Sequence, residues 1–207
     1  MDKGIKIMHF DFVDIGTCDF ETSAHIANKD EKVLLVEPLE FYLNRVPSSS
    51  NTTKANLAVG DTNGHIDVKF VPEDLINQYN LPHWIKGCSN VGEGYHNTVV
   101  RVFAENNLPL SLIETRQVET LTFLELCNRY GITSIGFLKI DTEGYEQYIL
   151  PNVLEQIKNG FYIGTLKYEN QASLGNKVFV DNLTTQFLNN GYEIVEINQT
   201  DTTLRKR

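Results

Sequence analysis

The sequence lacks the features that mark membrane, disulfide-stabilised and metal-binding proteins. No apolar run approaches the roughly 20 residues that a transmembrane helix needs, and the N-terminal residues contain no apolar core of a signal peptide. The three cysteines are odd in number and lack the spacing of metal ligands. We therefore expect a cytoplasmic protein with reduced thiols, without membrane contact and without a bound transition metal.

Basic residues are also scarce. The chain has 18 lysines and arginines against 27 aspartates and glutamates, a formal net charge of −9. This balance opposes binding to nucleic acid or to an anionic membrane, because both require a basic face. The 207 residues, 41% of them hydrophobic, are enough for one globular domain, which we expect to span residues 1–207. Nothing in the sequence indicates an oligomeric state.

Short apolar runs alternate with helical patterns along the chain. We expect strands at residues 10–15, 33–36, 54–59, 66–70, 99–103, 114–119, 135–140, 161–168 and 192–197. We expect helices at residues 39–46, 72–79, 121–130, 145–158 and 176–189, with a further helix after Gly16 that places Phe20, Ala24 and Ala27 on one face. This alternation predicts an α/β fold with a doubly wound, mostly parallel sheet.

Two segments interrupt the alternation. Asn63-Gly64 lies between apolar runs, which predicts a type I′ hairpin that joins residues 54–59 to residues 66–70. Residues 80–98 lack periodicity and hold the only tryptophan, two of the five histidines and three glycines. Long segments of this kind in a compact domain are usually functional or disordered. We expect residues 80–98 to form a variable loop that acts as a mobile lid or as one wall of a site.

Residues 10–22 read as a strand, a glycine turn and the start of a helix. A turn of this kind exposes backbone N–H groups at a helix N-terminus, where anionic groups bind. The alternative is an ordinary turn in which Gly16 only supplies a positive φ angle. A single glycine is not the G-x-G-x-x-G fingerprint, so this stretch alone leaves both interpretations open.

Glu37 follows a continuous apolar run and lies about 20 residues after Gly16. An acidic residue at the end of the second strand is placed to accept hydrogen bonds from ribose hydroxyls. The alternative is a solvated carboxylate at a strand end. The strand, turn and helix that precede Glu37 favour the ribose role.

Charged residues gather where a predicted buried strand ends. Alternation along that strand places Lys139 and Asp141 on the same side. Asp141, Glu143 and Glu169 lie at or just past the carboxyl ends of strands, where open α/β sheets bind ligands. Three explanations compete: a bound metal, a cationic or hydroxyl-rich ligand, and solvated helix N-termini. The last suits Glu143 and Glu146, which open a helix, better than it suits Asp141.

Six blocks of sequence carry a more specific pattern between residues 10 and 170. They are Val13-Asp14-Ile15-Gly16, Val36-Glu37-Pro38, residues 56–61 with Gly64, residues 118–124, residues 138–146 (LKIDTEGYE) and Tyr168-Glu169-Asn170. In content and order these blocks resemble the motifs of the FkbM family of S-adenosylmethionine-dependent methyltransferases. The run LKIDTEGYE resembles the signature of that family.

The resemblance implies a fold, a cofactor and a reaction. The fold is the Rossmann-like class I methyltransferase fold, in which residues 202–206 and 192–197 would form a closing antiparallel hairpin. The cofactor is S-adenosyl-L-methionine, and the reaction is methylation of a hydroxyl on a small molecule or glycan. The positions that match the family for cofactor binding are Asp14, Gly16, Thr17, Asp19, Glu37, Pro38 and Asp61.

Methyl transfer from a sulfonium is an in-line displacement that depends mostly on positioning. A hydroxyl nucleophile also benefits from a base within hydrogen-bond reach. Asp141 is the first candidate for this base, and Glu169 is the second. Lys139 would form an ion pair with its neighbour or orient the acceptor.

The first loop departs from the family pattern, which usually reads G-A-N-x-G. Here the loop is Gly16-Thr17-Cys18-Asp19-Phe20, with Phe20 in place of the second glycine. The resemblance therefore implies that the methionine end of the cofactor sits differently in this chain, or that Asp19 helps to hold it.

Three other functions compete with this one. A catalytically silent module of the same fold would bind cofactor or a partner without turnover, and the altered first loop keeps that alternative open. A nucleic-acid 2′-O-methyltransferase would use a catalytic set of charged residues at adjacent strand ends, namely Lys139, Asp141, Lys167 and Glu169. The net charge of −9 opposes nucleic acid as a partner. An NAD-dependent oxidoreductase would share the glycine turn and the strand-end carboxylate but needs the full glycine fingerprint.

Overall fold

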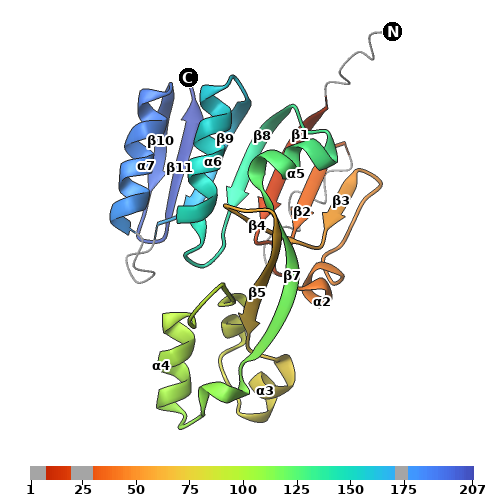
Figure 1. The fold of residues 1–207 in the computed structure, drawn as a ribbon, viewed down its shortest axis with the longest axis vertical. Coiled ribbons are helices and arrows are strands. Elements are labelled where there is room, and N and C mark those ends of the chain that lie inside the picture. The colour runs from red at the N-terminus through yellow and green to blue at the C-terminus, as the bar shows by residue number, and fades with distance from the viewer. Residues whose placement is uncertain (1–7, 20–29, 171–176) are drawn as a thin grey trace.

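A computed structural model of the chain describes residues 8–19, 30–170 and 177–207. Within them the fold is mixed α/β, as expected, with a mostly parallel sheet at its centre (Figure 1). Six strands of this sheet run in the same direction, and β11 is antiparallel to both of its neighbours, β9 and β10. The strand order is β10 (Tyr192–Ile197), β11 (Asp201–Lys206), β9 (Tyr162–Glu169), β8 (Ser134–Ile140), β1 (His9–Ile15), β2 (Val33–Val36) and β3 (Thr52–Ala55).

Apolar side chains place the central strands in the interior. All four residues of β2 are buried, because a parallel strand with both faces covered has no solvent side. The register sets Ile15 of β1 beside Val36 of β2 and Ile140 of β8. The loops that follow these three strands therefore meet at one edge of the sheet.

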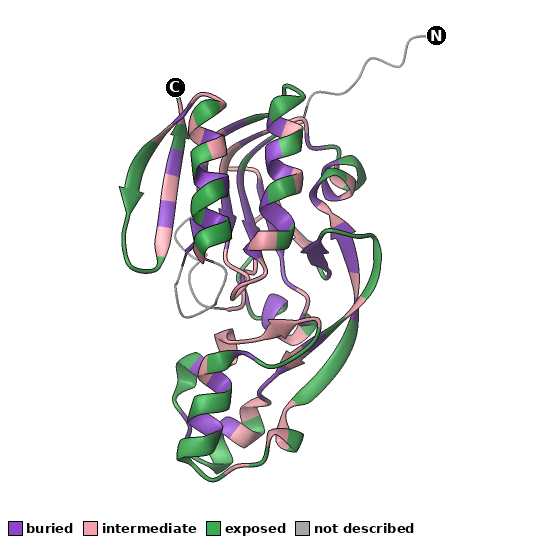
Figure 2. Ribbon diagram, turned by 60° about the vertical axis from the view of Figure 1, so that its left-hand side comes forward, coloured by how far each residue is buried: buried purple, intermediate pink, exposed green. Residues whose placement is uncertain are grey.

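Three helices cover one face of the sheet: α5 (Phe123–Tyr130), α6 (Glu146–Lys158) and α7 (Lys177–Asn189) (Figure 1). Each buries an apolar stripe. Figure 2 shows that the central strands are mostly buried, whereas the edge strand β10 is mostly exposed. A short helix, α2 (Glu40–Leu43), follows β2. The helix expected at Phe20, Ala24 and Ala27 lies outside the described residues.

Residues 64–122, here called the extension, project beyond the edge where the strand-end loops meet (Figure 1). They supply three strands of a second sheet whose order is β4 (Ala58–Gly60), β7 (Glu114–Thr122), β5 (Gly64–Phe70) and β6 (Asn90–Val91). They also form the helices α3 (Glu73–Gln78) and α4 (Asn97–Glu105) and the 3₁₀ helices η1 (His83–Gly87) and η2 (Leu110–Leu112). A small apolar core, which includes Ile76, Ile85 and Phe103, holds these helices together.

The predicted hairpin at Asn63-Gly64 is wrong. Residues 54–59 divide between β3, in the central sheet, and β4, in the second sheet. Strands β4 and β5 do not pair with each other, because each pairs with an opposite side of β7. The side chain of Asn63 accepts a hydrogen bond from the N–H of Thr122 at 2.8 Å, which ties this turn to the end of β7.

The predictions for residues 80–103 also change. Residues 99–103 lie in helix α4, where Val99, Val102 and Phe103 form the buried face and Val100 is exposed. Residues 80–98 are not one continuous loop, because they contain η1, β6 and the start of α4.

Among the described residues, no helix combines the length and the apolarity that a membrane crossing requires.

Candidate active site

Gly16 brings two strand-end loops into contact. Its φ angle is +87°, and its N–H donates to the carbonyl of Val36 at 2.9 Å. A Cβ atom at this position would lie 1.8 Å from the carbonyl oxygen of Asp141. Only glycine therefore allows the loop after β1 to pack against the loop after β8.

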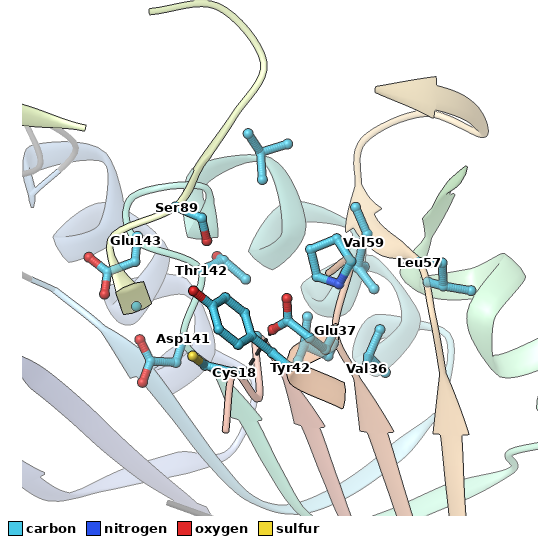
Figure 3. Close-up of a pocket in the computed structure, with 16 residues that line it drawn as sticks. Cys18, Val36, Glu37, Tyr42, Leu57, Val59, Ser89, Asp141, Thr142 and Glu143 are labelled. Atoms are coloured by element: carbon cyan, nitrogen blue, oxygen red, sulfur yellow. Dashed lines mark hydrogen bonds between the residues drawn. The ribbon is translucent and has the colours of Figure 1, made fainter. Parts of the chain in front are cut away.

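Glu37 ties the first loop to the second. Its side chain is buried, and the backbone N–H of Cys18 donates to one of its oxygens at 2.8 Å (Figure 3). The N–H of Leu39 donates to the other oxygen at 2.9 Å. Cys18 has a left-handed conformation, with φ +45°. Burial raises the pKa of Glu37 to about 7, although the two hydrogen bonds favour the ionised form.

A cavity opens beside this carboxylate, here called the Glu37 cavity (Figure 3). Its empty volume, including the part open to solvent, is about 530 Å³. One side of its lining is mostly apolar and consists of Val36, Pro38, Tyr42, Leu57, Ala58 and Val59. Another side comes from the extension and consists of Gly87, Ser89 and Val91. The Tyr42 hydroxyl is buried in this lining without a hydrogen-bond partner among the described residues.

A second cavity, the Trp84 cavity, adjoins the first. Its empty volume, including the part open to solvent, is about 1080 Å³. Strand-end residues and residues of the extension line it together: Gly16, Thr17, Cys18, Lys139, Asp141 and Glu143, with Trp84, Gly87, Cys88, His96 and Thr98. Gly16, Asp141 and Glu143 line both cavities. A molecule in one cavity would therefore meet a molecule in the other at the end of β8.

Lys139 lies between two carboxylates, as alternation along β8 predicts. Its ammonium is 3.2 Å from the carboxylate of Asp141 and 3.8 Å from that of Asp14. Asp14 is fully buried and lies at the same register on the neighbouring strand β1. The buried ion pair fixes the direction of the lysine, and the lysine in turn orients Asp141, whose side chain is 35% exposed.

Three carboxylates converge beside Lys139. The oxygens of Asp141, Glu143 and Glu169 lie within 4.8 Å of one another. Glu169 is buried at the end of β9, and Glu143 has φ +55°, an uncommon conformation for glutamate. Carboxylates at this spacing repel one another, so they favour a proton, a cation or a hydroxyl donor between them.

The comparison with known families decides what kind of domain holds these cavities. The sequence model of the methyltransferase FkbM domain matches residues 14–194, which is most of the chain. The chain belongs to the FkbM methyltransferase family. The resemblance seen in the sequence is thereby confirmed.

The other comparisons add little. The search of curated proteins finds no match. Among solved structures, the ribosomal protein L11 methylase from Lactobacillus delbrueckii subsp. bulgaricus aligns over 98% of this chain and 73% of that chain, at 8% sequence identity. The TM-score of this alignment is 0.32, too low to bear on the fold or the function.

Glu146, the last residue of the run LKIDTEGYE, contacts other residues of the same run. It is fully buried, which corrects the expectation of a solvated helix N-terminus. One of its oxygens accepts from the N–H and the hydroxyl of Thr142, at 2.7 and 2.8 Å, and the other accepts from the N–H of Gly144 at 3.0 Å. Burial raises the pKa of Glu146 to about 7, and the hydrogen bonds from Thr142 oppose this shift. Glu146 thus holds the loop that carries Asp141.

The extension brings in Cys88 and His96, which the sequence did not single out as site residues. Nε2 of His96 lies 3.0 Å from Glu143, and the three side chains offer ligand atoms within 4.8 Å of one another. Nδ1 of His96 accepts the N–H of Thr98 at 3.2 Å, so a neutral ring carries its proton on Nε2, facing Glu143. Burial and the nearby carboxylates raise the pKa of the Cys88 thiol to about 12.

Three positions matched to the family for cofactor binding lie apart from both cavities, and the first is Asp14, the buried partner of Lys139. Asp61 is exposed after β4 and lines neither cavity. Asp19 forms ion pairs with Lys86 of the extension, at 2.5 Å, and with Arg45, at 3.5 Å. Asp19 therefore joins the first loop to the extension, a role that the sequence does not indicate.

Proposed function

We propose that this methyltransferase uses S-adenosyl-L-methionine to methylate a hydroxyl of a small molecule or glycan. The observation that carries the proposal is that the Glu37 cavity and the Trp84 cavity meet at Gly16 and Asp141. One cavity would then hold the cofactor and the other the acceptor. The class I methyltransferase fold belongs to the same proposal, which the strand order β3-β2-β1-β8-β9-β11-β10 supports.

The residues of the Glu37 cavity fit this cofactor. Glu37 lies at the end of the second parallel strand, where a carboxylate accepts from ribose hydroxyls, and Leu57 and Val59 offer apolar contacts to a purine. The unpartnered Tyr42 hydroxyl, among the residues described, offers a ligand one more hydrogen bond. When bound, the cofactor supplies a methyl group on a positively charged sulfur. Gly16, Thr17 and Pro38 line one or both cavities and complete the proposed cofactor set. Asp14, Asp19 and Asp61 line neither cavity and would act on the cofactor only through the loops to which they belong.

Asp141 is the proposed general base. It lines both cavities, so it lies where an acceptor hydroxyl would approach the cofactor, and its carboxylate would accept the hydroxyl proton. Lys139 holds this carboxylate in place through the 3.2 Å ion pair. Glu169, close to Asp141, is the second candidate for the base. Trp84, 48% exposed, and the carboxylates of the Trp84 cavity suit an acceptor with an apolar face and several hydroxyls.

The substitution Glu37→Ala is expected to weaken S-adenosylmethionine binding by roughly 1.5–3 kcal/mol, the usual value for hydrogen bonds to a charged group. Glu37 lies beside the apolar side of the cavity, whereas the other carboxylates in its described lining, Asp141 and Glu143, come from the loop after β8. Isothermal titration calorimetry on the wild type and the variant measures the change. Unchanged affinity would argue against the ribose role of Glu37.

The affinity for S-adenosylhomocysteine is expected to rise with pH and to level off above about pH 7. In the ligand-free protein the pKa of Glu37 is raised to about 7, and ribose hydroxyls that donate to its carboxylate would lower it on binding. Binding therefore releases a proton at lower pH, and the affinity falls by at most about tenfold per pH unit. Calorimetry at about pH 5.5 and about pH 8 tests this. The same pH dependence in Glu37→Gln would show that another group is responsible.

Titration of the protein with S-adenosylmethionine, NAD and a short RNA separates the competing functions. The proposal predicts saturable binding of S-adenosylmethionine alone. The RNA alternative is weakened because Lys167, a member of its catalytic set, forms an ion pair with Asp201 at 3.5 Å. Binding without methyl transfer to any of a panel of sugars and small hydroxylated molecules would favour the catalytically silent module.

A further inference from the structure

Tyr42, in helix α2, is buried among several side chains at the edge of the Glu37 cavity. Its side chain is 1% exposed, and the ring of Phe41 packs against it with 4.4 Å between ring centroids. The guanidinium of Arg45 and the ammonium of Lys86 lie 5.8 and 6.0 Å from the centroid of the Tyr42 ring. These contacts come from α2, from the residues just after it and from the extension, and a turn of the ring would break them.

The hydroxyl of Tyr42 differs from those of other buried tyrosines. Tyr192 donates its hydroxyl to the carbonyl of Ile163 at 2.7 Å, and the Tyr168 hydroxyl lies 2.6 Å from that of Thr184. The Tyr42 hydroxyl is buried without a hydrogen-bond partner among the described residues. A buried hydroxyl that makes no hydrogen bond lowers the stability of the folded protein, so its retention calls for a reason.

The position of this hydroxyl supplies the reason. Figure 3 shows Tyr42 among the residues that line the Glu37 cavity, with its hydroxyl directed into the cavity. Burial raises the pKa of Tyr42 well above its usual value, so the group stays a neutral hydrogen-bond donor. Glu37, in the same lining, accepts hydrogen bonds, so the two side chains offer a ligand one donor and one acceptor.

We infer that Tyr42 donates a hydrogen bond to the nucleoside part of the cofactor and selects for it, an inference that rests on the cofactor binding proposed above. The nucleoside is favoured over the amino-acid part because Tyr42 shares the cavity with Glu37 and with the apolar residues Leu57 and Val59. A nucleoside offers ring nitrogens and hydroxyl oxygens that accept such a bond, together with apolar faces that suit those walls.

The test is the substitution Tyr42→Phe, which removes one oxygen and keeps the ring. The affinity for S-adenosylhomocysteine and that for adenosine should both fall by roughly three- to tenfold, as expected for one lost hydrogen bond between neutral groups. The thermal midpoint of the ligand-free variant should stay the same or rise, because the unpartnered buried hydroxyl is gone. Lower affinity with undiminished stability is a combination that damage to the fold does not produce.

Tyr192→Phe is the matched control, because the Tyr192 hydroxyl donates to the carbonyl of Ile163 in β9 and does not line the cavity. It should lower the thermal midpoint and leave both affinities unchanged. Equal affinities for wild type and Tyr42→Phe would overturn the inference while leaving the proposed function intact. A loss confined to S-adenosylhomocysteine would overturn the assignment to the nucleoside. Absence of binding to the wild type would overturn the proposed function itself, and this inference with it.

Discussion

Replacement of Asp141 by asparagine is expected to lower the turnover number roughly 10²- to 10⁴-fold, the usual contribution of a general base. The substitution keeps the shape of the side chain and removes its capacity to accept a proton. The affinity for S-adenosylhomocysteine should change little, because Glu37 and the backbone of the Gly16 loop are unaltered. Single-turnover rates with methyl-labelled cofactor, on an acceptor found by screening sugars and small hydroxylated molecules, and calorimetry on the same variant give both quantities.

Asp67→Asn is the control for this experiment. Asp67 is exposed on β5 and lines neither the Glu37 cavity nor the Trp84 cavity, so its substitution should alter neither rate nor affinity. Loss of affinity together with rate in Asp141→Asn would show that Asp141 supports the cofactor or the loop. Wild-type behaviour of Asp141→Asn would remove it from the mechanism and leave Glu169, or positioning alone, to account for the reaction.

Gly16→Ala is expected to lower the free energy of unfolding by about 3 kcal/mol or more and to abolish cofactor binding. A φ angle of +87° costs alanine about 1–2 kcal/mol. In addition, the new Cβ would lie 1.8 Å from the carbonyl oxygen of Asp141, so the two loops must separate. Denaturant unfolding and calorimetry with S-adenosylhomocysteine measure the two effects.

Gly92→Ala separates these two costs. Gly92 has nearly the same φ angle, +82°, but no atom of the described residues would lie within 4 Å of an added Cβ. The free energy of unfolding of this variant should therefore fall only by the cost of the left-handed backbone conformation, about 1–2 kcal/mol. If both variants lost the same free energy, the contact between the loops after β1 and β8 would not be what requires glycine at position 16.

The central sheet could be predicted because its strands are continuous apolar runs. Val33–Val36 is buried at every position, and a run of this kind is typical of a parallel strand covered on both faces. Alternation along β8 placed Lys139 and Asp141 on the same side, where they lie 3.2 Å apart. The shared direction of parallel strands then placed their carboxyl ends, and the charged residues after them, at one edge.

The extension was harder to predict because local preferences and tertiary packing disagree there. The β-branched run at residues 99–103 favours a strand over five residues. The helix is shown by the spacing of Val99, Val102 and Phe103 and by the cap that His96 provides. The turn at Asn63-Gly64 favours a hairpin, but the strand that pairs with β5 is β7, which comes much later in the sequence.

Part of the site could not be predicted, because it is assembled from distant segments. Lys86 meets Asp19, and His96 meets Glu143, only because the extension packs against the strand-end loops. Lys86 and His96, the two partners from the extension, lie in none of the sequence motifs described above. Tyr42 reads in the sequence as an ordinary apolar residue of a helix, and its role becomes visible only from the burial of its unpartnered hydroxyl among the described residues.

The crystal structure of the complex with S-adenosylhomocysteine tests the central claim most directly. We expect the ribose hydroxyls to donate to Glu37, the nucleoside to lie within hydrogen-bond distance of the Tyr42 hydroxyl, and the sulfur to face the Trp84 cavity beside Asp141. A nucleoside bound outside the Glu37 cavity, or a sulfur that faces away from Asp141, would contradict this account.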